Sequence, residues 1–543
     1  MCISPLSKRA PDSWRDGNLC ALFALLIAIA LAILLSLTTS VAAPARPAIR
    51  PFEGDPTVVA NNRIDELVQA NLDRLKITAA PLCSDAVFLR RAYLDVIGTL
   101  PTWYETRDFL LSRDPKKRQH LIDRLLEREE FADYWAMKWS DLLRVKAEFP
   151  INLWPNAAQA YYRWIRTSIK GNKPYDQFVR EMLTSSGSNF REPAVNFYRA
   201  MQNHQPEGIA QTVALTFMGT RAEKWPTNQL ASMAAFFATL GYKGTSEWKE
   251  EIIYFDQSKS NAPATATFPD GTTTHLTPDQ DPRQVFADWL IDEKNPWFTR
   301  NIANRIWTCF LGRGIINEPD DIRPDNPPSN PELLSYLETQ VISTHYNLKE
   351  FMREILNSRT YQSSALPADT NPEAATNFAC YSVRRIEAEV LIDAIDQITS
   401  STERYTSAIP EPFTYIPENH RSIALPDGSI SSAFLELFGR PPRDTGLESE
   451  RNNRFTANQA LHLLNSTHIL NKIEQSRLVT YGGNQKVSNQ QLANGMFLTV
   501  LSRFPTLDEQ SATTKYFKDK SDRSARIDLL WALLNSPEFL YRH

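Results

Sequence analysis

Apolar residues recur three and four positions apart along most of this 543-residue chain, with polar and charged residues between them. This spacing places the apolar side chains on one face of a helix, so it predicts a mainly α-helical, multi-helical fold. We expect helices at residues 64–75, 87–97, 107–111, 121–126, 131–145, 157–169, 175–183, 209–218, 230–240, 302–310, 333–341, 388–398, 457–473, 492–501 and 527–534.

One region departs from the helical spacing. Residues 252–255 form a short apolar run, and residues 264–276 alternate around Pro269, Asp270 and Gly271. Alternation on both sides of such a turn is typical of a small β-hairpin. We therefore predict a linker with this hairpin at residues 245–280, between an N-terminal helical domain (61–244) and a C-terminal helical domain (281–543).

Two stretches of the chain resemble each other. Residues 94–105 and 498–509 both end in Pro-Thr-x-x-Glu, and residues 355–361 partly repeat the segment that follows the second copy. A Thr and a Glu at this spacing can each satisfy a backbone N–H group of the other, which predicts capping boxes at Thr102 and Thr506. Duplication of a module and convergent helix starts both explain the similarity, and either origin makes the motif structural.

The first 45 residues read as a secretory leader. Lys8, Arg9 and Arg15 precede an apolar run at 21–35, and small residues follow at 40–45. This is the pattern of a cleaved signal peptide, and it predicts export to the periplasm or cell envelope, with residues 46–60 as a linker. The alternative is an uncleaved N-terminal anchor, which would give the only membrane contact that we expect.

Composition and charge argue against several classes of function. The formal net charge is −4, whereas a nucleic-acid-binding protein is expected to carry a clustered basic face. Only 18 glycines are present, which disfavours glycine-rich phosphate loops. The sequence contains no Walker loop, no Gly-x-Ser-x-Gly motif and no His-Glu-x-x-His motif.

Cysteine and histidine residues give no sign of a metal site. Outside the leader, Cys83, Cys309 and Cys380 are widely spaced, so we interpret them as buried free cysteines and not as zinc ligands. His462 and His468 are six positions apart, which would place them on different faces of one helix. We therefore expect no bound metal.

The stretch from residue 295 to residue 333 concentrates Arg, Asp, Asn and Pro beyond what packing requires. Arginine side chains pair bidentately with carboxylates, phosphates or sulfates. If the charges converge, they would bind an anionic ligand such as a sulfated or uronic-acid glycan. The interpretation that we prefer is a structural network, because neighbouring carboxylates neutralise most of the arginines. The candidate residues are Arg305, Asp320, Asp321, Arg323, Arg359, Arg384, Arg385 and Glu387.

A second charged cluster contains paired carboxylates, which serve as acid and base in glycoside hydrolysis. Its mixture of charges also favours a salt-bridge network. The residues are Arg440, Arg443, Asp444, Glu448, Glu450 and Arg451. A group of aromatic residues could stack on sugars, but its helical spacing favours a place in the core. That group is Trp135, Trp139, Trp154, Tyr161, Tyr162 and Trp164.

Ordered motifs cover nearly all of the chain after the leader. They are FLRRAYLDVIG with LPT at 88–102, FADYWAMKWSDLL at 131–143, DPR and ADWL at 281–290, the 295–333 stretch, NSRTYQ at 357–362, RRIEAE at 384–389, FGRP with RDT at 438–445, and QALHLLN at 459–465. In this order they resemble a pair of planctomycete domains of unknown function, PSCyt-two-like followed by PSD-one-like. The family is often found beside cytochrome c domains.

The chain departs from this family where many members attach haem. Those members carry Cys-x-x-Cys-His after a helix that ends like residues 217–221, whereas here Arg221 runs directly into Ala222. A second cysteine pair is replaced by Leu447 and Ser449. Without these thiols covalent haem is not supported, and we expect no cofactor.

The residues leave open whether the protein is an enzyme. The leading hypothesis is an exported envelope component that binds or scaffolds other exported proteins, which the resemblance suggests are cytochrome c-type or sulfatase-like. One alternative is a hydrolase-type enzyme that acts on an envelope or sulfated polysaccharide through the Arg/Asp loop. Another is an accessory to a cytochrome c electron-transfer partner. We expect no nucleic-acid partner.

Overall fold

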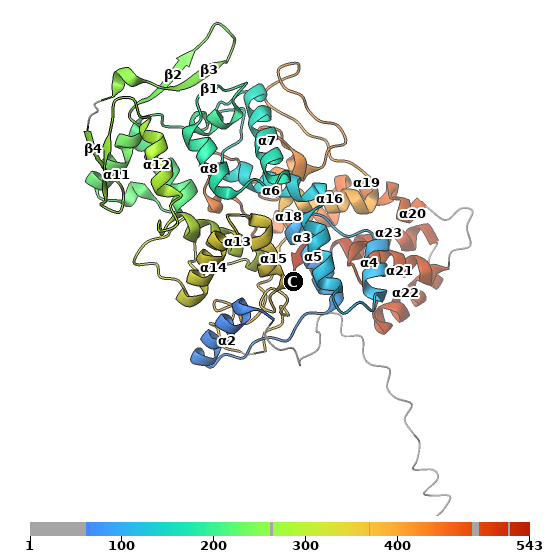
Figure 1. Ribbon diagram of the computed structural model, residues 1–543. Coiled ribbons are helices and arrows are strands. Elements are labelled where there is room, and N and C mark those ends of the chain that lie inside the picture. Colours follow the sequence, from blue (N-terminus) through green and yellow to red (C-terminus); the bar gives the residue numbers. More distant parts are fainter. Residues whose placement is uncertain (1–60, 261–263, 369, 481–487, 520–521) are drawn as a thin grey trace, which may run out of the picture. The chain divides into compact units, whose positions relative to one another are not determined.

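The computed structural model describes residues 61–260, 264–368, 370–480, 488–519 and 522–543, and its fold is mainly α-helical (Figure 1). The first helices are α2 (Arg63–Leu75), α3 (Asp85–Val96), α4 (Trp103–Leu111), α5 (Lys117–Leu126), α6 (Glu129–Leu142), α7 (Pro155–Lys170), α8 (Tyr175–Thr184), α9 (Asn196–Arg199), α10 (Pro206–Val213) and α11 (Thr227–Ala234). The later helices are α12 (Pro282–Leu290), α13 (Phe298–Leu311), α14 (Pro331–Ser343), α15 (Leu348–Asn357), α16 (Ala388–Thr399), α17 (Ala433–Leu437), α18 (Ala457–Asn465), α19 (Thr467–Gln475), α20 (Arg477–Thr480), α21 (Asn489–Val500), α22 (Leu507–Asp519), α23 (Asp522–Leu534) and α24 (Pro537–Leu540).

Within the described residues, three small antiparallel sheets accompany the helices. In the first, β3 (Glu251–Phe255) lies between β1 (Gly187–Ser188) and β2 (Leu240–Gly244). In the second, β4 (Ala264–Thr267) pairs with β5 (Thr273–Leu276), which confirms the predicted hairpin. The third joins β6 (Arg384–Arg385) to β7 (Tyr541–Arg542), so it ties two segments that are distant in the sequence.

Both predicted capping boxes are present. At the start of α4, the Thr102 N–H donates to the Glu105 carboxylate at 2.8 Å, and the Glu105 N–H donates to the Thr102 hydroxyl at 3.3 Å. At the start of α22, Thr506 and Glu509 make the same two bonds, at 2.7 and 3.3 Å. Because α21 packs on α4, the two similar segments are neighbours (Figure 1). Their origin by duplication stays a hypothesis.

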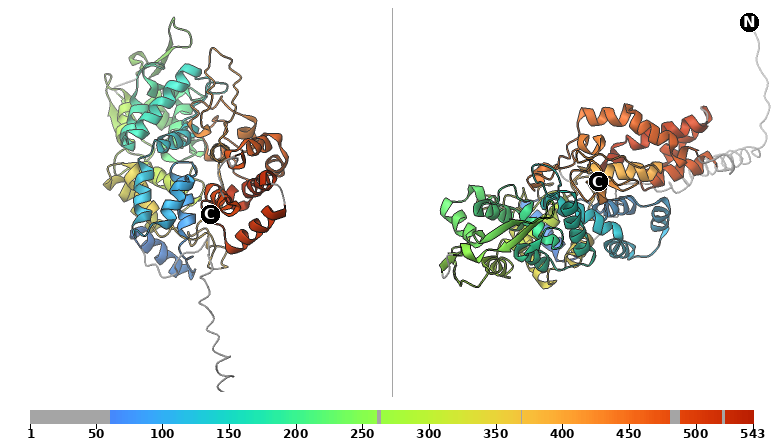
Figure 2. Two further views of the ribbon diagram at one scale, coloured as in Figure 1. Left: turned by 90° about the vertical axis from the view of Figure 1, so that its right-hand side faces the viewer. Right: turned by 90° about the horizontal axis from the view of Figure 1, so that it is seen from above.

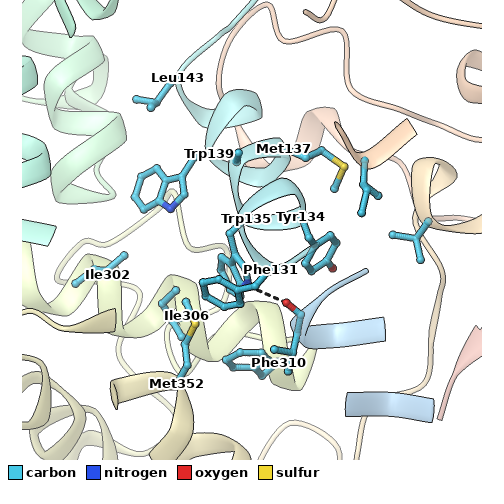
Figure 3. Close-up of a cluster of buried hydrophobic side chains, with 14 of the residues drawn as sticks. Phe131, Tyr134, Trp135, Met137, Trp139, Leu143, Ile302, Ile306, Phe310 and Met352 are labelled. Atoms are coloured by element: carbon cyan, nitrogen blue, oxygen red, sulfur yellow. Dashed lines mark hydrogen bonds between the residues drawn. The ribbon is translucent and has the colours of Figure 1, made fainter. Parts of the chain in front are cut away.

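The hydrophobic core draws on both predicted domains. Phe131 and Trp135 of α6 lie against Ile306 and Phe310 of α13 (Figure 3). The rings of Trp135 and Phe310 meet edge to face with centroids 5.8 Å apart, and the Trp135 indole N–H donates to the carbonyl of Val96 at 3.2 Å. Burying each large side chain of this kind contributes about 1.5–3 kcal/mol. The described residues, from 61 to 543, fall within one compact unit, and the domain boundaries at residues 244 and 281 stay predictions.

Some predicted helices end or break earlier than the apolar spacing suggests. The predicted helix at 457–473 is wrong as a single element, because Ser466 separates α18 from α19 and its hydroxyl accepts a hydrogen bond from the N–H of Ile469. The predicted helix at 230–240 ends sooner, since a single 3₁₀ turn, Ala235–Phe237, follows α11 and Leu240 opens β2. The helices α18–α23 pack mainly on one another (Figure 2).

The predicted leader, at residues 1–45, and the linker at 46–60 lie outside the residues that the structure describes. Within the described part of the chain, no helix is both long enough and apolar enough to cross a membrane.

Candidate functional site

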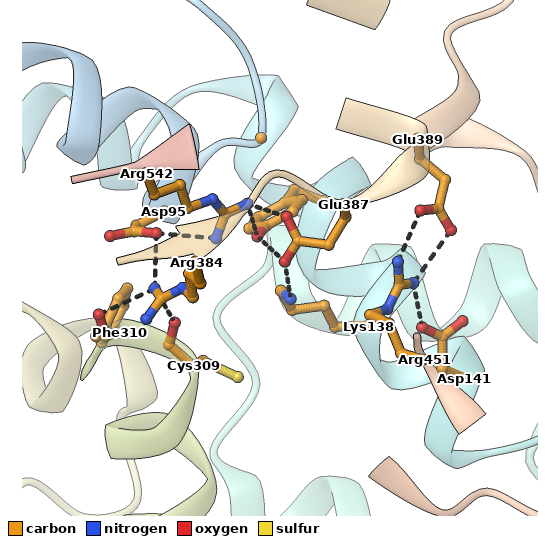
Figure 4. Close-up of polar contacts among 12 residues, drawn as sticks. Asp95, Lys138, Asp141, Cys309, Phe310, Arg384, Glu387, Glu389, Arg451 and Arg542 are labelled. Atoms are coloured by element: carbon orange, nitrogen blue, oxygen red, sulfur yellow. Dashed lines mark hydrogen bonds and ion pairs between the residues drawn. The ribbon is translucent and has the colours of Figure 1, made fainter. Parts of the chain in front are cut away.

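Two of the predicted residues, Arg384 and Glu387, belong to a network around Asp95, which lies on α3 and is almost completely buried. Its carboxylate accepts hydrogen bonds from Arg384 at 3.0 Å and from Arg542 at 2.9 Å (Figure 4). The hydroxyls of Tyr361 and Tyr381 also donate to it, at 3.0 and 2.9 Å. Asp95 and Arg542 are not among the residues predicted from the sequence, because nothing in the sequence marks two residues so far apart as partners.

Glu387 continues this network from the other side of Arg542. It pairs with the Arg542 guanidinium and with the Lys138 ammonium, the latter at 3.1 Å (Figure 4). Burial opposes its ionisation, but the positive charges of Arg542 and Lys138 outweigh burial and hold the pKa of the Glu387 carboxyl well below its ordinary value. Lys138 is on α6, so the network links the N-terminal helices to residues 384–387.

A second buried network runs from α6 to residues 440–451. Asp141 accepts from Arg443 at 2.9 Å and from Arg451 at 2.6 Å. Arg451 also binds Glu389 at 2.7 Å, and Arg440 lies 3.6 Å from the same carboxylate. The second cluster predicted from the sequence is therefore divided. Its three arginines take part in these pairs, whereas its other members are less buried and lie outside them.

Arg305 and Asp320, the centre of the first predicted constellation, form a buried ion pair of their own at 2.5 Å. The other Asp320 oxygen accepts from the backbone N–H of Glu448 at 2.7 Å, and the Arg305 Nε donates to Asn301 at 3.0 Å. These bonds fix Arg305, the loop that contains Asp320 and the backbone of Glu448 to one another.

The other predicted residues lie elsewhere. Asp321 and Arg323 pair with each other at 3.0 Å, and Arg323 also reaches the exposed Asp325. Arg385 donates to backbone carbonyls, including that of Phe438 at 2.5 Å. Arg359 donates through its backbone N–H to Asp65. The eight residues of the first constellation therefore do not converge on one site, and ligand binding by them stays a prediction.

The predicted aromatic group is mostly core, as expected, with one member in a partly exposed cluster. Trp154 contacts Trp248 and Phe413, with ring centroids 4.7 and 6.1 Å away. Trp248 and Phe413 are 59% and 49% exposed. The Lys249 ammonium lies 5.3 Å from the Trp154 ring and 5.9 Å from the Trp248 ring. We call Trp154, Trp248, Lys249 and Phe413 the aromatic cluster.

The prediction that His462 and His468 point apart is wrong. Because the helix breaks at Ser466, the two rings meet, with His462 Nε2 3.3 Å from His468 Nδ1. His468 Nε2 in turn lies 2.9 Å from the Glu403 carboxylate. Burial and the neighbouring His468 lower the pKa of His462.

Cys83, Cys309 and Cys380 are free, and Cys83 and Cys380 are buried as predicted while Cys309 is half-buried. Among the described residues, no group of three or more His, Cys, Asp and Glu side chains is placed to hold a metal ion. The absence of a cofactor stays a prediction.

The fold and its charge networks define a class of protein. It is a mainly helical protein whose N-terminal and C-terminal parts contribute to one hydrophobic core and are joined by buried ion pairs. Two family models match it in order. Residues 63–240 match PSCyt2, described as a protein of unknown function (DUF1549), and residues 282–517 match PSD1, described as a protein of unknown function (DUF1553). The chain therefore belongs to the family of proteins that carry this pair of domains. No match was found among curated proteins or solved structures.

Proposed function

We propose that this protein is an exported, non-catalytic binding component that docks another exported protein through the aromatic cluster. The observation that carries the proposal is the exposure of Trp248 and Phe413 in contact with each other and with Trp154. Exposed apolar groups gathered in one place mark interaction sites, and tryptophan is enriched among the residues that dominate binding energy.

The cluster is assembled from three separate segments of the chain. Trp154 precedes α7, Trp248 and Lys249 lie in the turn between β2 and β3, and Phe413 belongs to a loop of the C-terminal part. Trp154 and Lys249 have φ values of +70° and +63°, a conformation that L side chains rarely adopt. Backbone strain of this kind costs about 1–3 kcal/mol per residue and persists where the surrounding structure enforces it, often at binding sites.

The partner that we propose is an exported cytochrome c-type or sulfatase-like protein. This choice rests on the family pairing and on the predicted leader, since an exported protein meets only exported partners. The pair of nearby tryptophan rings and the Lys249 ammonium would accept an apolar side chain flanked by a carboxylate.

Native co-purification tests this proposal. The tagged protein would be recovered from its own envelope as wild type, as Trp248→Ala and as a control, Tyr104→Ala, which removes an aromatic side chain that is 56% exposed on α4. We expect one partner at near-equal amounts with the wild type and the control, and its loss with Trp248→Ala. Equal recovery with all three proteins, or no partner with the wild type, would refute the proposal.

A further inference from the structure

A large cleft lies apart from the aromatic cluster and the buried charge networks. It is formed by residues 220–229 on one side and by residues 296–328 on the other, and its volume is about 650 Å³. Ligand-binding clefts in proteins have volumes of about 300–1,000 Å³. The cleft includes part of the Arg-, Asp- and Pro-rich stretch that stands out in the sequence, chiefly residues 321–328.

The charged side chains of the cleft favour an anion. The cleft is lined by four cationic residues, Arg221, Lys224, Arg300 and Arg323, and by the carboxylates Asp321 and Asp325. Because Glu338 pairs with Arg300 from outside the lining, the excess is one positive charge. The Lys224 ammonium lies 3.8 Å from Asp321. Arg323 pairs with both carboxylates, at 3.0 and 2.9 Å. Arg300 uses its Nε for Glu338 at 2.6 Å, a bond that leaves its two Nη atoms for a ligand.

Arg221 is the side chain whose pairing is incomplete. Its Nε is buried and has no hydrogen-bond partner among the described residues, and none of them forms an ion pair with its guanidinium. A buried donor without an acceptor is unfavourable, so most such donors in proteins find a partner. An anionic group bound in the cleft would give the Arg221 guanidinium its counter-charge.

The backbone holds Arg221 in place. Gly219, two residues earlier, has φ +63° and ends a π-helical turn. The N–H of Ile322 donates to the Gly219 carbonyl at 2.9 Å, and the Thr220 hydroxyl donates to the Ile322 carbonyl at 3.1 Å. These bonds tie the two walls of the cleft together, so little ordering would be needed when a ligand binds.

The uncharged side chains of the cleft indicate which kind of ligand molecule would carry the anionic group. Trp225 and Trp297 line the cleft, together with prolines from both sides. Rigid apolar walls with a few convergent polar groups suit a ligand that has flat apolar faces as well as charge. A sugar ring with a sulfate or carboxylate substituent has both features, whereas a free inorganic anion has no face to pack.

We propose that this cleft binds an acidic saccharide, in which Arg221 and Arg300 hold sulfate or carboxylate groups and Trp225 and Trp297 pack against the sugar rings. Guanidinium groups bind both kinds of anion bidentately. The cleft is separate from the aromatic cluster, so this proposal does not depend on whether a partner protein docks at the aromatic cluster.

Calorimetric titration of the purified protein tests this inference. The probes are a heparin-derived hexasaccharide, a hexagalacturonate, the desulfated form of the first, and sodium sulfate. The variants are Arg221→Gln, Trp225→Ala and a control, Arg163→Gln, which alters an exposed arginine of α7. Thermal unfolding midpoints of all variants establish that each is folded.

We expect at least one acidic hexasaccharide to bind the wild type and Arg163→Gln equally, and the desulfated form to bind weakly. Arg221→Gln and Trp225→Ala should each weaken binding about tenfold or more while both variants remain folded at the temperature of the titration. Three results would overturn the proposal: no acidic saccharide binds, sodium sulfate binds as tightly as the saccharide, or the two cleft variants bind as the control does.

Discussion

Asp95 and Arg542, which are 447 residues apart in the sequence, form an ion pair of 2.9 Å in which both side chains are almost completely removed from solvent. Burying two charges carries a large desolvation cost, which only good geometry and further hydrogen bonds can offset. Asp95 meets that condition, because Arg384 and two tyrosine hydroxyls complete its coordination. The pair therefore holds α3, β6 and β7 in one arrangement.

Removing the Asp95 charge should destabilise the protein strongly. Asp95→Asn would leave Arg542 with one uncompensated contact in a buried site, and breaking a buried pair in this way costs about 3–5 kcal/mol. The control Arg63→Gln alters a pair in which both side chains are 57% exposed, and it should cost less than about 1 kcal/mol. Urea denaturation midpoints measure both changes, and equal shifts for the two variants would contradict the prediction.

Gly219→Ala should destabilise the fold and deform the cleft. A Cβ atom at this position would lie 2.7–2.8 Å from Asn301, Ile322 and Pro319, and the backbone has φ +63°. We expect a loss of about 2 kcal/mol or more. Gly495→Ala on α21 is the matched control, because nothing lies within 4 Å of its added Cβ. That change should be stabilising by about 0.5–1 kcal/mol, since glycine weakens a helix interior. Thermal unfolding distinguishes the two signs.

Asp393 should make stability depend on pH. Burial raises the pKa of its carboxyl to about 6, although Arg421 and the N–H groups of Ser422 and Ile423 favour ionisation. Between about pH 4 and pH 6 the folded chain then binds more protons than the unfolded chain, for which the pKa is about 3.9. The contribution of Asp393 to stability therefore falls as the pH rises through this window.

The test compares the wild type with Asp393→Asn from pH 4 to pH 7. The asparagine cannot ionise, so the stability of the wild type relative to the variant should decrease by up to roughly 3 kcal/mol across the window. Asp108→Asn, at a residue whose side chain is 66% exposed, serves as the control and should leave the pH profile unchanged. A pH-independent difference between the wild type and Asp393→Asn would disprove the assignment.

The two capping boxes should make similar contributions to stability. Thr102→Ala and Thr506→Ala each remove the hydroxyl that accepts the N–H of a glutamate at the start of a helix. Each change is expected to cost about 1 kcal/mol. Thr339→Ala, at an exposed position within α14, should have little effect because alanine is the better helix former there. Denaturation of the three variants provides the comparison, and a neutral result at either box would show that its bonds are not needed.

Local patterns predicted most of the fold. The helical periods, the Pro-Asp-Gly hairpin and the capping boxes each depend on neighbouring residues, which the sequence contains in full. The predicted helix at 457–473 failed because its apolar period continues through Ser466, whose side chain caps the next helix instead. The strand β2 was missed because its residues follow a helical run and pair only with β3.

The sites were less predictable, since they depend on residues that are distant in the sequence. Most arginines of the buried networks were recognised, but Arg542 was not. The carboxylates Asp95 and Asp141 were also missed, because they lie on helices whose periodicity already explained them. Arg221 looked unexceptional because its incomplete pairing depends on the surrounding fold. An arginine that lacks a partner can be recognised only when its neighbours in the fold are known.

The pairing of β7 with β6 has a consequence for how the chain folds during synthesis. At about 5–20 residues per second, Arg542 is translated roughly 20–90 seconds after Asp95, which is 447 residues earlier. Through that interval the Asp95 carboxylate lacks one of the two arginines that pair with it. The network around Asp95 can therefore be completed only after the segment that contains β7 has been synthesised.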